Sequence, residues 1–568
     1  MPAISLREPL RKVRGFLTPP RDAGRPAVPA PAQGLAPVML ALVTALMVYL
    51  LVKQGTEYVA FNAAEAVFAW AAVIGIATLA FAWVRYDGMP RFGQRFLRAS
   101  ALFLVIYTTV QPFDIPYVVL PLDHPAVQYH QHARPFALVL AALGLWRPGF
   151  VFGSAMLVWM IRDLHQPLTG YYFSDLDIRN VLEVIVLGSA GAVTAAAARQ
   201  VRTWRDILRL DEAAESRAVI VILAAGFGGH LGNYFYSALA KLALDGPPLN
   251  WLYNNDLQAL VLSGIEKGVF PFTFSPFLTE VIFVTVGALA IPFCVGSFVV
   301  QGSALIAPLK RSWMIAVTLV LDLFHLLVYV TAGLLFWKWM ALNTIIVATM
   351  AVMTDAEWNR LARRTGAVFV LISPVFFKTA TLAWYDTTAF VSVYFEAETE
   401  DGDRYRIPNA YFGTASYQVS QAQLFIPRST KHFTHGIGGS TMGYDDVLAA
   451  RRCEIPERAE PVGPYNGPRN RLTEYARARH RQMLARIDED GIYNYYLQAH
   501  HHVPHPFVHD PVYVLDKRDI AKYHYVVESV CLGWEQGAFQ RDVIARSAFE
   551  VYDTRTDSGP VRAVTVGE

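Results

Sequence analysis

The chain has 568 residues, of which 54% are hydrophobic and 17% carry a charge, and its mean hydropathy is +0.30. This balance indicates a multi-pass membrane protein. The net charge of +2 excludes the basic excess of a nucleic-acid-binding protein, and three cysteines are too few for a disulfide-dense module.

The N-terminal residues 1–35 are basic and rich in proline. No cleavage site follows the first apolar run, so this stretch does not have the pattern of a cleaved signal peptide. We expect residues 1–35 to form a disordered cytoplasmic tail.

Eleven apolar runs follow the tail and predict a bundle of about eleven membrane-spanning helices. Lysine and arginine gather in every second loop, which by the positive-inside rule places the N-terminus in the cytoplasm and residues 389–568 outside it. Residues 36–95 hold two N-terminal spans, and residues 96–388 hold the main transmembrane domain. The runs lie at 36–52, 64–84, 99–120, 126–146, 149–164, 180–198, 218–243, 278–301, 313–335, 338–353 and 366–388.

The seventh run ends on a lysine, Lys241, at its extracytoplasmic end. At 100° per residue, the polar residues of this run fall within roughly 100° of one another and form one stripe. Ionisable groups inside a membrane helix usually face a protein interior or a wet cavity, although a lysine at a helix end can also extend to the interface. The stripe consists of His230, Asn233, Tyr234, Ser237 and Lys241.

Two neighbouring segments add polar groups near this lysine. Residues 244–277 are broken by proline and glycine, which predicts an amphipathic or re-entrant element lying over Lys241. In the ninth run, Asp322, His325 and Tyr329 share one helix face. A carboxylate beside an imidazole can tune the basicity of the histidine, and it can equally serve as a helix–helix hydrogen bond.

Residues 389–568 predict a soluble α+β domain. Residues 390–408 alternate around an Asp401-Gly402 turn and indicate a β-hairpin, with further strands expected at 511–516 and 561–567. A charged helix is expected over 469–487. Cys453 and Cys531 permit one disulfide in an oxidising compartment.

Five histidines cluster between residues 499 and 509 of this domain. Histidine is a common metal ligand, yet the intervening prolines prevent helical i, i+4 spacing, and the sequence holds no CxxC or HExxH motif. We therefore expect no metal and interpret the cluster as a surface or interface loop. These weak metal candidates are His500, His501, His502, His505 and His509.

The order of several short motifs resembles the vitamin K-dependent γ-glutamyl carboxylases and their bacterial HTTM-domain relatives. The resemblance covers roughly residues 96–353 and extends less closely to the C-terminal domain. The motifs are Gly144-Leu-Trp-Arg147, Tyr234-Phe-Tyr-Ser-Ala-Leu-Ala-Lys241-Leu, Trp251, Phe274-Ser-Pro-Phe277, Lys310-Arg311 and Phe324-His325.

The resemblance implies a membrane enzyme that couples oxidation of a reduced, vitamin K-like quinone by O2 to abstraction of a glutamate proton and capture of CO2. It implies that Lys241 is the base that deprotonates the quinol and that His325 acts beside it. A lysine in a poorly solvated pocket has its charged form disfavoured and can serve as a base. The quinol and substrate pocket is expected to contain His230, Tyr234, Ser237, Trp251, Asp322 and Tyr329. The expected partners are the lipid bilayer, the quinone, and a protein or peptide substrate at the extracytoplasmic domain.

A second interpretation is a non-catalytic membrane scaffold whose histidine-rich domain binds a partner or a metal. A third is a transporter, for which the sequence shows no inverted repeat. The burial of Lys241 distinguishes the first two. A lysine that opens to a cavity shared with His325 and Tyr234 favours the enzyme, and a lysine in bulk water favours the scaffold.

Overall fold

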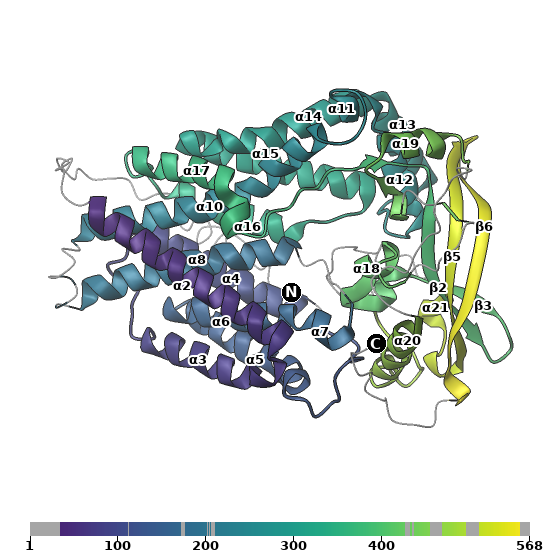
Figure 1. Ribbon diagram of the computed structural model, residues 1–568, viewed down its shortest axis with the longest axis horizontal. Helices are drawn as coiled ribbons and strands as arrows, with labels where there is room; N and C mark the ends of the chain where they lie inside the picture. The colour runs from purple at the N-terminus through teal and green to yellow at the C-terminus, as the bar shows by residue number, and fades with distance from the viewer. Residues whose placement is uncertain are drawn as a thin grey trace, which may run out of the picture.

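The computed structural model describes residues 35–556 apart from 112, 172–175, 202, 204, 206–210, 426–431, 434–436, 455–468 and 496–510. The chain is mostly helical. A bundle of long helices forms one end of the molecule and a β-sheet forms the other, with short helices between them (Figure 1).

The bundle is built from the apolar segments of the first two thirds of the chain. Each of the eleven predicted runs contains a helix in the structure. The long helices are α2 (Leu35–Asn62), α3 (Val67–Ala80), α4 (Arg91–Val110), α5 (Pro125–Gly144), α6 (Gly149–Asp163), α8 (Leu176–Gln200), α10 (Glu212–Leu242), α13 (Pro276–Ala288), α14 (Ala290–Gly302), α15 (Arg311–Ala332), α16 (Trp337–Ala351) and α17 (Arg360–Phe376). Shorter helices are α7 (His165–Thr169), α11 (Asn250–Asn254) and α12 (Leu257–Glu266).

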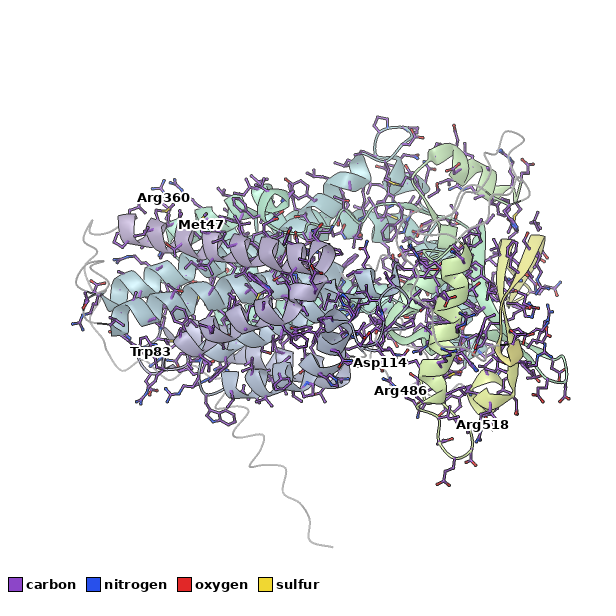
Figure 2. The ribbon with its side chains drawn as sticks, turned by 60° about the horizontal axis from the view of Figure 1, so that its bottom comes forward. Met47, Trp83, Asp114, Arg360, Arg486 and Arg518 are labelled. Carbon is purple, nitrogen blue, oxygen red and sulfur yellow. A yellow bond between two sulfur atoms is a disulfide. The ribbon has the colours of Figure 1, made fainter. Side chains whose placement is uncertain are left out.

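Among the described residues, four helices are long and apolar enough to cross a membrane: those at 37–62, 178–200, 212–242 and 311–332. A fifth span results if the bent pair α13–α14 is counted as one. Large apolar side chains are exposed on these helices, such as Leu323 on α15 and Met47 on α2 (Figure 2). Such a surface is suited to lipid, and membrane association follows, whereas the number of eleven spans stays a prediction.

The eighth run, 278–301, is not the single straight span that its hydropathy predicted. α13 and α14 meet at a bend of 74°. Pro292 lies four residues after Ala288, the last residue of α13. A proline lacks the N–H that would bond to that carbonyl, and its ring clashes with it, so the helix breaks at this point.

Two further runs are helical over different bounds than predicted. The run 99–120 begins earlier and ends at Val110, because Pro112 disfavours helical geometry at the residue before it. The run 366–388 is helical only to Phe376. Its terminal carbonyl accepts hydrogen bonds from Tyr49 Oη (2.9 Å) and Lys53 Nζ (3.0 Å) of α2, which satisfy the helix end.

The C-terminal domain contains a four-stranded antiparallel sheet in the order β3-β2-β5-β6. The predicted hairpin is present as β2 and β3, with Phe395 opposite Ile407, and the predicted charged helix is α20. The strands are β2 (Ala389–Thr399), β3 (Arg404–Ile407), β5 (Ile520–Glu535) and β6 (Ala538–Asp553), with β1 (Tyr385–Asp386) and β4 (Ser440–Thr441) paired apart from them. The remaining helices are α18 (Ser416–Ser420), α19 (Tyr444–Arg451), α20 (Arg469–Leu484) and α21 (Pro511–Val514).

The predicted strand at 511–516 is wrong. This segment forms α21 followed by a 3-10 turn, because Pro511 suits the first position of a helix and Asp516 accepts a hydrogen bond from the backbone N–H of Arg518 (2.8 Å). The predicted strand at 561–567 lies outside the described residues. Cys453 and Cys531 form a disulfide that joins the end of α19 to β5.

Charged contacts fix the sheet domain against the bundle. Arg486, just after α20, donates to Asp114 beyond α4 with an Nη2–Oδ1 distance of 2.8 Å (Figure 2). At the other side, Glu266 at the end of α12 is 4% exposed and accepts from Arg406 (3.0 Å) and Arg541 (2.7 Å) of the sheet. These ion pairs therefore hold the sheet domain in a fixed position against the helices.

Candidate functional site

An apolar cavity of about 570 Å³ lies between the sheet-facing ends of α10, α14, α15 and α16. Lys241 and Tyr234 of α10 line it together with His325 of α15, which lies more than 80 residues after Lys241 in the chain. Aromatic and aliphatic side chains make up most of the wall. They include Trp251, Phe293, Phe324, Phe336 and Trp339.

Lys241 lines this cavity and is buried from bulk water, since the residue is 7% exposed. Its Nζ donates to Gln301 Oε1 (2.8 Å) and to the backbone carbonyls of Leu382 (2.9 Å) and Ser237 (3.3 Å). The Trp251 ring lies with its centroid 5.0 Å from Nζ. No carboxylate pairs with Lys241 among the residues that the structure describes. The acceptors within hydrogen-bonding distance of the ammonium are all neutral, while the Asp386 carboxyl of the same cavity attracts it from farther away.

His325 and Tyr234 form the second polar element of the cavity. The Tyr234 hydroxyl lies 2.9 Å from His325 Nε2, and both residues are buried. The His325 ring packs beside Phe336 and Trp339, at centroid distances of 5.1 and 5.8 Å. This packing fixes the imidazole in one orientation facing the cavity.

A buried asparagine, Asn343 of α16, links these groups to the rest of the polar stripe. Its Nδ2 donates to Asp322 Oδ1 (2.7 Å) and to Tyr234 Oη (3.2 Å), and its Oδ1 lies 2.9 Å from His230 Nε2. A continuous hydrogen-bond network therefore runs through α10, α15 and α16. Such networks orient their members more firmly than isolated pairs do.

The structure divides the predicted site residues into two groups. Lys241, Tyr234, Ser237, Trp251 and His325 line the cavity. Three others do not: His230, Asp322 and Tyr329 are absent from its wall. Asp322 is linked to the cavity through Asn343, and His230 is linked to it through Asn343 and through ring contacts with Tyr234 and Trp339. Tyr329 sits one turn beyond His325 on α15 and makes no contact with this network in the part of the chain described.

Two residues of the stripe bind the extended segment that follows α17. Asn233 Oδ1 accepts from the backbone N–H of Ala380 (2.7 Å), and Ser237 Oγ accepts from that of Leu382 (3.0 Å). The same segment then presents the Leu382 carbonyl to Lys241. The polar stripe of α10 thus positions an irregular backbone that closes one side of the cavity, which is tolerated at membrane depth only where protein satisfies it.

Sequence reasoning missed four lining or linking residues: Gln301, Trp339, Asn343 and Asp386. Gln301 and Asn343 are polar residues in apolar runs, so the criterion that identified His325 also applies to them. Asp386 lies in β1, inside the predicted run 366–388 but beyond its helical part, and is 4% exposed. Its burial raises the pKa of this carboxyl to about 7, against hydrogen bonds from Asn255 and Trp384 that favour the ionised form.

The five clustered histidines at 500–509 lie outside the described residues. Among the residues that are described, no group of three or more histidine, cysteine or acidic side chains is arranged to hold a metal ion. The expectation of a metal-free site is not tested by this arrangement.

Removing the Tyr234 hydroxyl is expected to weaken the site without unfolding the chain. Tyr234→Phe keeps the ring but deletes the hydrogen bonds of the hydroxyl with His325 and Asn343. We therefore expect the melting temperature to fall slightly and the rate of turnover to fall roughly tenfold. Tyr236→Phe on the same helix is the matched control, because its hydroxyl donates to the Leu371 carbonyl away from the cavity. Equal turnover of the two variants contradicts a role for the network.

Comparison of the chain with protein-family models, with curated proteins and with solved structures gave no significant match. The functional assignment therefore rests on the geometry of the site and on the motifs in the sequence.

Proposed function

We propose that this chain is a membrane enzyme of the γ-glutamyl carboxylase type, in which Lys241 is the base for oxidation of a reduced quinone by O2. The observation that carries the proposal is that Lys241, Tyr234 and His325 line one apolar cavity, with Lys241 7% exposed. A lysine that only extends to the membrane surface would instead be solvated.

The residues of the cavity fit a reduced quinone. A volume of about 570 Å³ falls in the range of small-molecule sites, and aromatic walls suit a flat ring system. Trp339 and Phe336 stack at a centroid distance of 5.6 Å and form a ready aromatic surface. When bound, a reduced quinone and O2 would supply the strong base that proton abstraction from glutamate requires.

The protein's own contribution is proton handling, orientation and exclusion of water. Neutral Lys241 accepts a proton, and Gln301 and the Leu382 carbonyl then hold the resulting ammonium at 2.8 and 2.9 Å. The hydrogen-bonded Tyr234–His325 pair orients oxygen atoms on the other side of the cavity. Apolar walls keep water from a reactive intermediate.

Entry from the bilayer is supported by the wall that α13 and α15 form. Val281, Leu323 and Leu327 line the cavity and are also 44%, 56% and 45% exposed on the outside of the bundle. A lipophilic substrate could pass between these side chains without crossing water. The polar side of the cavity, at Asp386, faces the sheet domain, where a protein or peptide substrate is proposed to bind.

The proposed topology has eleven spans, a cytoplasmic N-terminus and an extracytoplasmic C-terminal domain. A reporter that is active only in the cytoplasm, fused after Glu568, is expected to be silent, whereas the same reporter fused after Arg205 should be active. Activity at the C-terminal fusion means that one span has been miscounted, with the pair 126–146 and 149–164 as the first to re-examine.

The enzyme proposal is tested with the purified full-length chain in lipid, a reduced naphthoquinone and dissolved oxygen. We expect oxygen uptake coupled to quinol oxidation, and incorporation of labelled CO2 into a glutamate-containing peptide. Quinol oxidation without incorporation restricts the proposal to the quinol chemistry. Absence of both favours the scaffold interpretation, in which the C-terminal domain binds a partner.

A further inference from the structure

The reaction proposed at Lys241 leaves a proton on the amine that has to be removed. The amine must become neutral again before it can act as a base a second time. Its hydrogen-bond acceptors are the Gln301 side chain and the carbonyls of Leu382 and Ser237, which are amide groups and cannot take over the proton. Continued turnover therefore requires a titratable group at the cavity wall.

One carboxyl lies at the boundary between the cavity and a second, polar chamber. This chamber has a volume of about 160 Å³ and adjoins the cavity on the side of the sheet domain. Besides Lys241, the titratable side chains that line the cavity are Tyr234, Cys294, His325 and Asp386. Of these four, only Asp386 also lines the polar chamber.

The polar chamber is suited to hold water. Lysine, serine and glutamine side chains line it, and a volume of about 160 Å³ is large enough for several water molecules. Its lining residues Lys267, Tyr417 and Gln421 are only half-buried, so solvent reaches this part of the wall. The chamber therefore provides a path from Asp386 towards the surface.

Hydrogen bonds hold the Asp386 carboxyl in one orientation at the boundary. Its Oδ2 accepts from Asn255 Nδ2 (2.8 Å), and its Oδ1 accepts from Trp384 Nε1 (3.0 Å). The backbone N–H of Asp386 donates in return to Asn255 Oδ1 (2.8 Å). Because a carboxylate oxygen can accept two bonds, both oxygens can still take a proton.

The surroundings of Asp386 allow its carboxyl to gain and lose a proton near neutral pH. Burial raises its pKa to about 7, against hydrogen bonds that favour the carboxylate. The charged and titratable side chains around it are Lys241 of α10 and Cys294 of α14 in the cavity, Arg162 of α6, Lys267 after α12 and Lys338 of α16 in the chamber, and Asp256 before α12.

We propose that Asp386 is the proton-relay residue of this site, which takes the proton from the Lys241 ammonium and releases it to water in the polar chamber. In the first step an N–H bond of Lys241 breaks and an O–H bond of Asp386 forms. The second step restores the carboxylate, and no electron is transferred. The carboxyl attracts the amine from beyond hydrogen-bonding distance, so the proton passes through one intervening water. This role rests on the proposed function of Lys241 as a base.

Rapid-quench kinetics separate the relay from the base. The purified full-length chain in lipid, equilibrated at pH 7, is mixed with a reduced naphthoquinone and oxygen, and quinol oxidation is followed through the first and later turnovers. The first turnover uses an amine that has already equilibrated with solvent, whereas each later turnover needs the relay. We expect Asp386→Asn to complete the first turnover at the wild-type rate and later turnovers at least roughly tenfold more slowly.

Two further measurements assign the effect to the carboxyl. Asp245→Asn is the matched control and should keep wild-type rates, because this exposed aspartate lies outside both linings although its carbonyl accepts from Tyr385 Oη (2.7 Å) of β1. Formate should restore part of the later turnovers of Asp386→Ala, because it supplies a carboxylate to the space that the side chain leaves.

Trp384→Phe tests the relay if Asp386 variants fail to fold. It keeps an aromatic ring at a half-buried position but removes the Nε1 donor, which favours the ionised carboxyl. The pKa of Asp386 should therefore rise, so that fewer molecules hold the accepting carboxylate at pH 7. We expect the later turnovers to slow severalfold at pH 7 and to recover at higher pH, with the first turnover unchanged.

The outcomes distinguish the relay from the proposed function. Wild-type quinol oxidation with equal later turnovers in Asp386→Asn and Trp384→Phe overturns the relay and leaves the role of Lys241 standing. Slowing of the first turnover as much as the later ones assigns Asp386 a structural role and also overturns the relay. Absence of quinol oxidation by the wild type overturns the proposed function itself, and the relay falls with it.

Discussion

Lys241→Ala is expected to abolish oxygen-dependent quinol oxidation, with a loss of at least roughly 100-fold, because general-base catalysis contributes that much or more. Lys241→Arg should fail as well, since a guanidinium stays protonated and cannot accept the proton. Oxygen uptake by the purified variants in lipid measures both. We also expect Lys241→Ala to lower the free energy of unfolding by about 1–2 kcal/mol, because Gln301 Oε1 and the Leu382 carbonyl lose their hydrogen-bond donor.

Three controls separate chemistry from folding in this experiment. Lys310→Ala, an exposed lysine in the turn before α15, should keep wild-type turnover. Small primary amines should restore part of the rate of Lys241→Ala, because they fit the space that the side chain leaves. His325→Ala should lose less activity than Lys241→Ala if it orients the oxygenated product. Wild-type turnover of Lys241→Ala contradicts the mechanism and favours the scaffold interpretation.

Loss of the Cys453–Cys531 disulfide is expected to destabilise the C-terminal domain strongly. The bridge closes a loop of 78 residues, and the chain-entropy model assigns about 4.5 kcal/mol to such a loop. The loop includes α20 and α21, and Arg486 just after α20 makes the ion pair with Asp114 that ties the domain to the bundle. The double variant Cys453→Ala/Cys531→Ala should therefore expose residues 389–556 to protease at a lower temperature than the wild type.

The reductant experiment provides the control for this prediction. Dithiothreitol should lower the protease-resistance temperature of the wild type to that of the double variant and leave the variant itself unchanged. Cys294 remains in both proteins as a buried thiol, so its presence does not distinguish them. An unchanged resistance temperature after reduction contradicts the prediction.

The helical pattern of the chain was predictable from hydropathy, because every apolar run is long enough to require internal backbone hydrogen bonding. The helix ends were less predictable. The bend at Pro292 follows from a local rule, whereas the end of α17 depends on Tyr49 and Lys53, more than 300 residues earlier in the chain. The hydropathy of a short stretch of sequence cannot predict helix ends that depend on such distant partners.

The candidate site shows the same division. Periodicity on one helix placed Lys241, Tyr234 and Ser237 on a common face, because the 100° rotation per residue is a local property of the backbone. The same argument grouped Asp322 and Tyr329 with His325, yet only His325 lines the cavity. A shared face spans roughly a third of a helix, and tertiary packing selects which part of that face is open.

The partners of Lys241 could not be read from the sequence. Gln301 lies 60 residues and Leu382 141 residues after Lys241 in the chain, and the carbonyl of Leu382 is a backbone group that the residue type does not reveal. Local sequence sets helices, turns and polar stripes, because these depend on neighbours within a few residues. Which stripes meet, which lysines are enclosed, and where a cavity remains depend on the packing of α10, α14, α15 and α16 against the sheet domain, and this packing arises only in the folded chain.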